Sequence, residues 1–525
     1  MIIPSARRGL PSALRTPIAI ALAAAVGGTI VAWHYHRLGL TLSHYDARGH
    51  LVVARRIADS ITPGWQQIGA VWLPLPHLLN AIPVQVDLLY RTGASGVAIS
   101  IAAFAIATGA IGWIVLSLTG SAGVAAAAAA VFALNPNVLY LQSTPMTEPL
   151  LLATTTVAVA MLMAWCRSRS QVVSGFSRPM QVRLDADTGA IGSVPQTRHV
   201  GCAFALACLT RYEAWPVTVS ALAVALWARW RRGQPLAAAA RDVAAVAVYP
   251  AVTILVFGVF SRVVIGEWFV ASGFFVPENK ALGDPWLAAA EIGWGPRMPS
   301  GLVLTWLGAA GAALALAIGL VSRRRADTLI VVSLLAMAAI PWTAFVKGHP
   351  FRIRYMVPLI AMEAIGAGIA AGTVTSRRMR LAGAIALLIL AGYELRPLDA
   401  SAPMVVEAQW DRPNAPVRAR VTACLGNRAP GAKVMASMGS LGHYMQEASR
   451  AGFAIGDFLH EGNGDIWLAA LDSPRPFVDW ILIEEKAEGG DMLARLARQR
   501  PSFLDGYERA CEGAGLVLYR RRDHG

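Results

Sequence analysis

Long apolar stretches recur along most of the chain and are separated by short polar segments. About 20 apolar residues are enough for a helix to cross the hydrocarbon core of a bilayer. About eleven such runs predict membrane helices at 17–38, 93–118, 122–141, 149–165, 200–209, 214–230, 243–265, 301–321, 328–346, 355–374 and 381–395. We therefore expect a polytopic α-helical membrane domain over residues 1–397 and a soluble α/β domain over residues 398–525.

The composition agrees with a membrane protein. Hydrophobic residues make up 55% of the 525 residues and charged residues only 15%, whereas a soluble domain carries about 25% charged residues. The net charge is +14, and most of the basic excess precedes residue 398, where basic residues usually mark cytoplasmic loops. No nucleic-acid partner is therefore expected. The first run could be a cleaved signal peptide, but it continues apolar beyond its small residues, which favours an uncleaved anchor.

Arginine clusters predict the orientation. Cytoplasmic loops are enriched in Lys and Arg, and in an eleven-span chain all the clusters fall on one side. They are Arg7/Arg8/Arg15, Arg167/Arg169, Arg229/Arg231/Arg232, Arg323/Arg324/Arg325 and Arg377/Arg378/Arg380. We expect a multi-pass protein of the cytoplasmic membrane with a cytoplasmic amino terminus and an extracytoplasmic C-terminal domain.

Other ionisable residues gather on the opposite, outer side. They are Asp46, Glu148, Arg211, Glu213 and those of residues 347–354. The run 200–209 is too short to cross the bilayer alone, because an α-helix rises only 1.5 Å per residue. Arg211 and Glu213 are therefore expected in a polar cavity below the outer surface, although Arg211 could instead extend its charge to the surface. Charged groups at such depth are costly and usually functional.

The first outer loop, about residues 40–92, is long enough to indicate a functional role. Charged and apolar residues alternate at helical spacing over 48–59 and predict an amphipathic helix along the membrane surface. Two prolines in Trp72-Leu73-Pro74-Leu75-Pro76-His77 predict an irregular turn rather than a helix. Trp72 could line a cavity or belong to an aromatic belt. An interfacial or capping role comes before catalysis for His77, as it does for His44 and His50.

Four segments form an ordered set over about residues 15–395. They are the Asp46 segment with Trp72 to His77, Thr144-Pro145-Met146-Thr147-Glu148-Pro149-Leu150, Thr210-Arg211-Tyr212-Glu213-Ala214, and His349-Pro350-Phe351-Arg352-Ile353-Arg354-Tyr355-Met356-Val357-Pro358. The set resembles the GT-C class of membrane glycosyltransferases, which includes glycosyltransferase family 39, the protein O-mannosyltransferases and the lipid A aminoarabinose transferase. Many relatives carry two adjacent acidic residues in the first outer loop, whereas this chain has only Asp46 there. A divalent metal is therefore not indicated, and no cofactor is expected.

The resemblance implies transfer of a sugar, with inversion, from a polyprenyl-phosphate donor to a lipid, glycan or protein acceptor at the outer face of the membrane. Such a reaction needs a proton acceptor for the attacking group. Asp46 is the first candidate and Glu148 the second, although Asp46 could instead form an ion pair with Arg48 or Arg55.

The donor phosphate needs cationic partners, and guanidinium groups bind phosphate with two parallel hydrogen bonds. We expect Arg211, Arg352 and Arg354 in this role, with Lys347 and His349 as auxiliaries. The remaining candidates for substrate binding are Glu213, Tyr355, Trp72 and His77.

A transporter, or a non-catalytic membrane scaffold for envelope glycan assembly, is the alternative. A transporter should show internal repeats and broken helices at mid-membrane. The sequence shows no repeat, and its ionisable residues gather at one face instead.

In the soluble domain, apolar segments predict strands at 432–437, 480–483 and 516–520 and a helix at 491–499. Cys424 and Cys511 both fall in this domain, where oxidising conditions permit a disulfide. Cys166, Cys202 and Cys208 lie in or beside spans.

Overall fold

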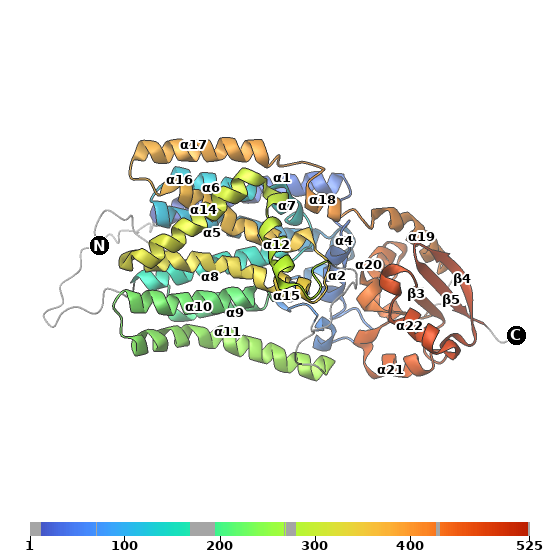
Figure 1. Ribbon diagram of the computed structural model, residues 1–525. Coiled ribbons are helices and arrows are strands. Elements are labelled where there is room, and N and C mark those ends of the chain that lie inside the picture. Colours follow the sequence, from blue (N-terminus) through green and yellow to red (C-terminus); the bar gives the residue numbers. More distant parts are fainter. Residues whose placement is uncertain are drawn as a thin grey trace, which may run out of the picture.

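The computed structural model describes residues 12–69, 71–168, 195–266, 268, 280–426 and 431–522. Long helices lie side by side in a bundle, and a smaller region that contains the strands covers one end of it (Figure 1). The α-helices are α1 (Ser12–Arg37), α2 (Tyr45–Arg55), α3 (Leu75–Asn80), α4 (Asp87–Thr92), α5 (Ala94–Thr119), α6 (Ala122–Ala133), α7 (Pro136–Leu141), α8 (Glu148–Ser168), α9 (Thr197–Cys208), α10 (Ala214–Arg231), α11 (Leu236–Ile265), α12 (Pro285–Trp294), α13 (Arg297–Ser300), α14 (Leu302–Val321), α15 (Ala339–Val346), α16 (Ile360–Gly372), α17 (Arg377–Glu394), α18 (Pro403–Glu407), α19 (Ala415–Cys424), α20 (Met438–Ala448), α21 (Asp465–Asp472) and α22 (Met492–Gln499).

Each predicted apolar run is largely helical. Within the described residues, seven helices are long and apolar enough to cross a membrane, and they lie at Leu14–Arg37, Ala94–Thr119, Glu148–Arg167, Leu236–Val264, Leu302–Val321, Arg323–Val346 and Ile353–Gly372. The other four predicted runs correspond to α6 with α7, α9, α10 and α17, which are shorter or carry more charge. The chain is a multi-pass helical membrane protein, and seven of the eleven expected spans meet the length and composition of a complete crossing.

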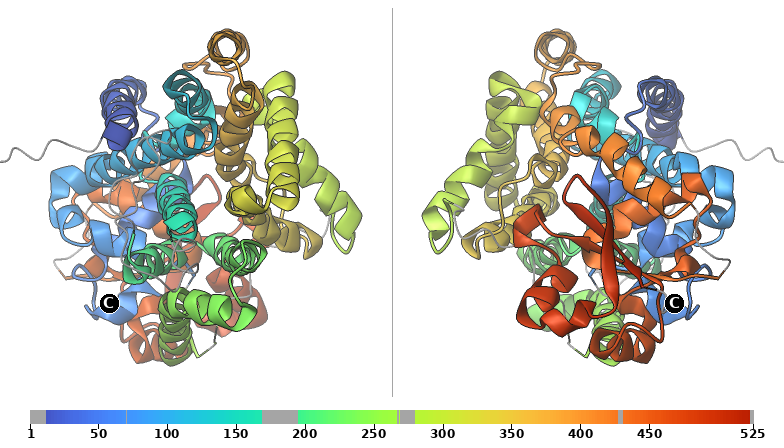
Figure 2. Two further views of the ribbon diagram at one scale, coloured as in Figure 1. Left: turned by 90° about the vertical axis from the view of Figure 1, so that its left-hand side faces the viewer. Right: turned by 90° about the vertical axis from the view of Figure 1, so that its right-hand side faces the viewer.

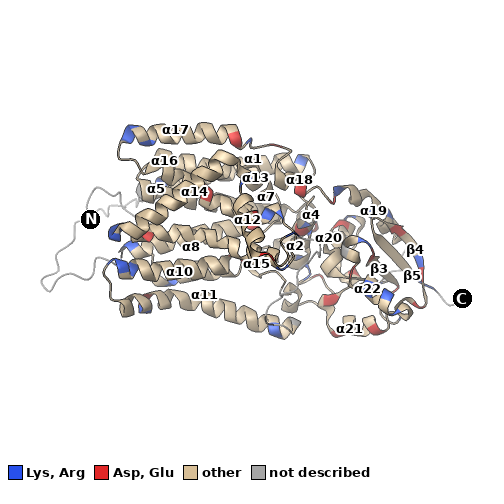
Figure 3. Cartoon of the chain, in the orientation of Figure 1, with Lys and Arg blue, Asp and Glu red and all other residues tan. Residues whose placement is uncertain are grey.

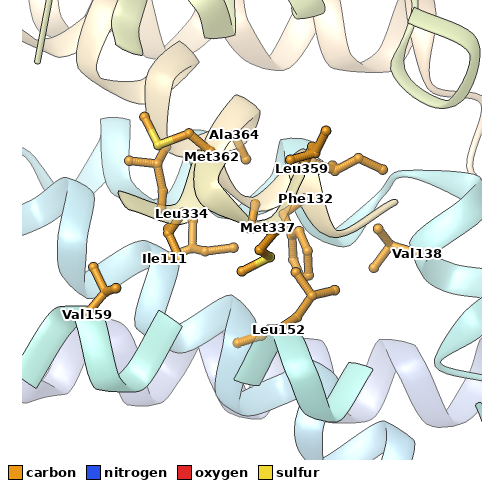
Figure 4. Packing of buried hydrophobic residues seen from close by; sticks show 14 of the residues in the cluster. Ile111, Phe132, Val138, Leu152, Val159, Leu334, Met337, Leu359, Met362 and Ala364 are labelled. Carbon is orange, nitrogen blue, oxygen red and sulfur yellow. The ribbon is translucent and has the colours of Figure 1, made fainter. Parts of the chain in front are cut away.

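Apolar side chains from distant parts of the sequence fill the bundle. Figure 4 shows Ile111 of α5, Phe132 of α6 and Leu152 of α8 close to Met337 of the 3-10 helix η4 (Arg323–Ala338). The helices α14 and α16 approach each other most closely at glycines, since a Cβ on Gly311 would overlap the carbonyl oxygen of Gly366. Small residues permit such close backbone contact between membrane helices. The end-on views show α17 at the periphery of the bundle (Figure 2).

The arginine clusters lie together at one end of the bundle, opposite the strands (Figure 3). Arg167 and Arg232 both pair with Asp327, at 2.5 and 3.1 Å, and Arg325 and Arg380 donate to backbone carbonyl groups at the carboxyl end of α5. The predicted gathering of the arginine clusters on one side of the membrane domain is therefore also seen in the fold. Arg7, Arg8 and Arg169 lie outside the described residues.

Helix α2 forms where an amphipathic helix is expected, but its surroundings differ from the prediction. Leu51, Val52 and Ala54 are fully buried, and α2 packs against α20 rather than along a membrane surface. The polar face is covered as well, because Arg48 pairs with Glu447 of α20. The prediction of an interfacial helix is therefore wrong.

The segment around the two prolines also differs from the prediction, because α3 begins inside it. Pro74 is the N-cap and Pro76 lies in the first turn. Proline is tolerated there because the first backbone N–H groups of a helix have no partner within the helix. The expectation of an irregular turn is therefore wrong from Leu75 onward.

The C-terminal region, residues 403–522, contains one mixed sheet of the order β2-β1-β3-β5-β4. Its strands are β1 (Val434–Ala436), β2 (Phe458–Leu459), β3 (Trp480–Glu484), β4 (Tyr507–Gly513) and β5 (Leu516–Arg521). β1 pairs in parallel with β2 and β3, whereas β5 pairs antiparallel with β3 and β4. The three predicted strands and the predicted helix, α22, are confirmed. A disulfide joins Cys424 of α19 to Cys511 of β4, with the Cα atoms 6.6 Å apart.

Candidate functional site

Asp46 and Arg354 form an ion pair at the end of the bundle that faces the C-terminal region. Asp46 lies in the first turn of α2, where the backbone N–H of Asp46 donates to Nδ1 of His44, the N-cap residue, at 3.1 Å. Arg354 lies in the 3-10 helix η5 (Ile353–Tyr355). Only 7% of Asp46 is exposed. Asp46 therefore pairs with neither Arg48 nor Arg55, the two partners considered from the sequence.

Other predicted residues surround this pair. Arg354 donates to the Tyr355 hydroxyl at 3.2 Å, and that hydroxyl lies 3.4 Å from Nε2 of His349. The guanidinium of Arg352 lies 5.2 Å from the centre of the Trp410 ring. Burial, followed by the charges of Arg354 and Arg352, holds the pKa of His44 well below its ordinary value. His44 is therefore uncharged near pH 7, and the cation that pairs with Asp46 is Arg354.

A second group centres on Arg211, in the turn between α9 and α10. Its guanidinium donates to Glu148 at 3.0 Å, to Glu213 at 2.7 Å and to the hydroxyl of Thr147 at 2.9 Å. Glu148, the first residue of α8, is fully buried. Burial opposes the charge on Arg211, but Glu148 and Glu213 outweigh it and raise its pKa. One positive and two negative side chains therefore form a buried triad with a net negative charge.

A cavity of about 50 Å³ opens beside this triad and is lined by His50, Trp72, Leu73, Pro76, His77, Thr147, Thr210, Arg211, Tyr212 and Glu213. It has room for a few water molecules but not for a sugar ring, so a sugar could enter only if lining side chains move. A cavity is thus present at Arg211 and Glu213, and Trp72 and His77 line it, but its surface is mostly apolar rather than polar as expected.

Hydrogen bonds determine which ring nitrogen bears the proton in each of the two cavity histidines, His50 and His77. Nδ1 of His77 faces the carbonyl oxygen of Leu73 at 3.2 Å, and Nε2 of His77 faces Nδ1 of His50 at 3.1 Å. A carbonyl only accepts, so Nδ1 of His77 donates, and in a neutral ring Nε2 must then accept from His50. Burial lowers the pKa of His77 to about 3 and that of His50 well below its ordinary value. Both rings are therefore neutral near pH 7.

Of the eleven residues expected in the site, ten belong to these two groups, and Lys347 is an exposed residue just after α15. The predicted residues that come together are Asp46, Glu148, Arg211, Glu213, His349, Arg352, Arg354, Tyr355, Trp72 and His77.

Sequence analysis missed the acidic residues that the C-terminal region contributes. Glu407 of α18 accepts a hydrogen bond from the backbone N–H of Ile353 at 2.9 Å. Asp411 lies 3.7 Å from Arg48, and Glu447 pairs with the same guanidinium. No motif distinguishes these residues, because their roles arise only when segments far apart in the chain meet. Within the described residues, no three His, Cys, Asp or Glu side chains form a metal-binding group.

The chain has the fold of ArnT, a protein of known structure, and the resemblance noted from the sequence is confirmed at the level of the fold. Two crystal structures of ArnT from Cupriavidus metallidurans are similar to it. The structure bound to undecaprenyl phosphate matches with a TM-score of 0.53 and 13% identity over 94% of this chain and 97% of that chain. The apo structure matches with a TM-score of 0.50 and 13% identity over 94% and 98%. At this identity the similarity shows the fold alone. No family model and no curated protein matches the sequence.

Proposed function

We propose that this protein is an inverting glycosyltransferase that moves a sugar from a polyprenyl-phosphate donor to a lipid, glycan or protein acceptor. The observation that carries the proposal is the buried Asp46–Arg354 pair beside the Glu148–Arg211–Glu213 triad. It supplies a carboxylate and a phosphate-binding cation at one end of a helical bundle with the ArnT fold. ArnT from C. metallidurans binds undecaprenyl phosphate, which supports a donor of that chemical class here.

In the proposed reaction an acceptor oxygen or nitrogen attacks the anomeric carbon of the donor sugar. The bond from that carbon to the phosphate oxygen breaks, and its electron pair leaves with polyprenyl phosphate. The proton of the attacking group passes to the Asp46 carboxylate, a contribution worth about 10²- to 10⁴-fold in rate. Because Arg354 is bound to Asp46, the donor phosphate must compete for the guanidinium, and its arrival frees the base.

Arg352 and Arg354 are the proposed phosphate ligands, since guanidinium groups bind phosphate through paired, charge-assisted hydrogen bonds. His349 and Lys347 are the auxiliaries on the same segment. Arg211 has a different proposed role from the one expected from the sequence. It already donates to Glu148, Glu213 and Thr147, and the negative triad disfavours a phosphate. The cavity with Trp72 and His77, once its lining side chains move, is instead proposed to hold part of the sugar, with the Glu213 carboxylate accepting hydrogen bonds from its hydroxyl groups.

The proposal is tested by the glycans of a strain that lacks the protein. Mass analysis of its glycolipids and glycoproteins should reveal a species that has lost one pentose or hexose. Wild-type protein should restore that sugar, and Asp46→Asn should not. Restoration by the variant would favour the alternative, a transporter or scaffold, because neither needs a proton acceptor at Asp46.

The proposed active end faces the outside of the cytoplasmic membrane. The arginine clusters at the other end support this orientation, since basic residues favour the cytoplasm. A reporter that is active only in the periplasm should work when fused after Gly525 and fail when fused after Arg232. The reverse pattern would place the site in the cytoplasm and contradict the proposal.

A further inference from the structure

A segment of the C-terminal region lies directly against the proposed phosphate-binding residues. It begins with α18, whose Met404 and Val405 are fully buried, and the backbone N–H of Met404 donates to Oδ1 of Asn137 at 2.8 Å. Helix α18 packs against α7 and against η5, which carries Arg354. The bundle therefore holds this segment in place beside the site.

Glu407, the last residue of α18, contacts the backbone of η5. Its Oε2 accepts the N–H of Ile353 at 2.9 Å, and only 9% of the residue is exposed. Burial raises the pKa of Glu407, while the Ile353 N–H and the charges of Arg354 and Arg352 act in the opposite direction. This carboxylate therefore fixes the main chain next to Arg354.

The segment also holds the helix that carries Asp46. Asp411 lies 3.7 Å from Arg48 and accepts two hydrogen bonds from Arg418, at 2.7 and 2.6 Å. Glu447 binds both Arg48 and Arg418. Arg48 follows Asp46 by two residues in α2, so the same stretch of chain constrains both members of the Asp46–Arg354 pair.

We propose that Glu407 is a positioning residue that holds the backbone at Ile353, so that Arg354 meets the donor phosphate while Asp46 lies beside it. This inference rests on the proposed function. It gives the C-terminal region a part in donor binding, because the phosphate-binding segment of the bundle is aligned from that region.

Substitutions of Glu407 separate positioning from charge. In Glu407→Gln the amide oxygen still accepts the Ile353 N–H, and removing a negative charge close to a phosphate site does not weaken phosphate binding. In Glu407→Ala the hydrogen bond is lost. Because the backbone beside Arg354 is then no longer held, affinity for undecaprenyl phosphate should fall about ten-fold or more in the alanine variant. The glutamine variant should bind within about three-fold of wild type or tighter.

Glu484 is the matched control. It is also 9% exposed and accepts backbone N–H groups, those of Lys486 and Ala487 at 2.8 and 2.9 Å, but it lies at the end of β3. Glu484→Ala should lower the melting temperature without changing affinity for undecaprenyl phosphate.

The experiment measures the dissociation constant of undecaprenyl phosphate and the melting temperature for full-length wild type and each variant in detergent. We expect Glu407→Gln to bind within about three-fold of wild type or tighter, and Glu407→Ala to bind about ten-fold or more weakly. Equal affinities of Glu407→Ala and Glu484→Ala would overturn the inference. If Glu407→Ala does not fold, weak binding by a folded Glu407→Gln would overturn it and unchanged binding would support it. A wild type that binds no undecaprenyl phosphate would instead refute the proposed function.

Discussion

Replacing Arg211 by Ala should destabilise the protein strongly, because it removes the only cation of the buried triad. Its guanidinium lies 3.0 Å from Glu148 and 2.7 Å from Glu213. Glu148 is fully buried and Glu213 is 5% exposed. Removing one partner of a buried ion pair costs about 3–5 kcal/mol, since the remaining charge has no compensation. Arg211→Ala leaves two such charges and should lie at the upper end of that range.

Glu148→Gln should have a much smaller effect. Arg211 keeps its pair with Glu213, the net charge of the triad changes from negative to neutral, and Gln can still accept a hydrogen bond from Arg211. We expect a cost of about 1 kcal/mol. In the double variant only Glu213 lacks a partner, so Glu148→Gln should partly rescue Arg211→Ala, with a coupling energy of about 1–3 kcal/mol.

Denaturant unfolding of the purified protein in mixed micelles at pH 7, followed by tryptophan fluorescence, measures all four members of this cycle. Purely additive free energies would refute the triad as a coupled unit. So would a double variant less stable than Arg211→Ala, because it would mean that Glu148 is not the charge left uncompensated.

Three further predictions concern other parts of the molecule. Asp46→Asn should keep less than about a tenth of wild-type transfer at equal expression, because an amide cannot take up the acceptor's proton; greater activity with purified protein would remove Asp46 from that role. Burial lowers the pKa of His77 to about 3 in the folded state, against about 6.5 in the unfolded state. Its contribution to stability is therefore complete above about pH 6.5 and declines by about 1.4 kcal/mol per pH unit below it, because only the unfolded state takes up the proton. His77→Gln should flatten the pH dependence of the melting temperature, and an unchanged slope would contradict this. Reduction of the Cys424–Cys511 bridge, which closes a loop of 87 residues, should cost about 4–5 kcal/mol, and unfolding without reductant should expose three thiols rather than five.

Much of the site could be predicted because its residues are polar exceptions beside apolar runs. Glu148 begins a spanning helix, and Arg211 follows a helix too short to cross alone. Ionisable residues next to apolar runs can be recognised in the sequence alone, and in a membrane protein they are usually functional.

The remaining features depend on contacts between distant segments. Glu407 meets Ile353 across 54 positions, and Arg48 meets Glu447 across 399. No local pattern distinguishes an ordinary acidic residue that becomes buried beside a site from one that stays in solvent. The surroundings of α2 were wrongly predicted for the same reason. The helix is amphipathic in sequence, but the C-terminal region covers its charged face in the fold.

The central claim is that the Asp46–Arg354 end of the bundle transfers a sugar from polyprenyl phosphate, and following the donor tests it most directly. Purified protein in lipid nanodiscs would receive undecaprenyl-phosphate pentoses or hexoses labelled in the sugar, together with an envelope extract as acceptor. Mass spectrometry would quantify undecaprenyl phosphate and labelled product. The account predicts that wild type releases undecaprenyl phosphate in proportion to labelled acceptor and that Asp46→Asn releases less than about a tenth as much. Release at the same rate by both proteins, or no release from any of these donors by wild type, would contradict it.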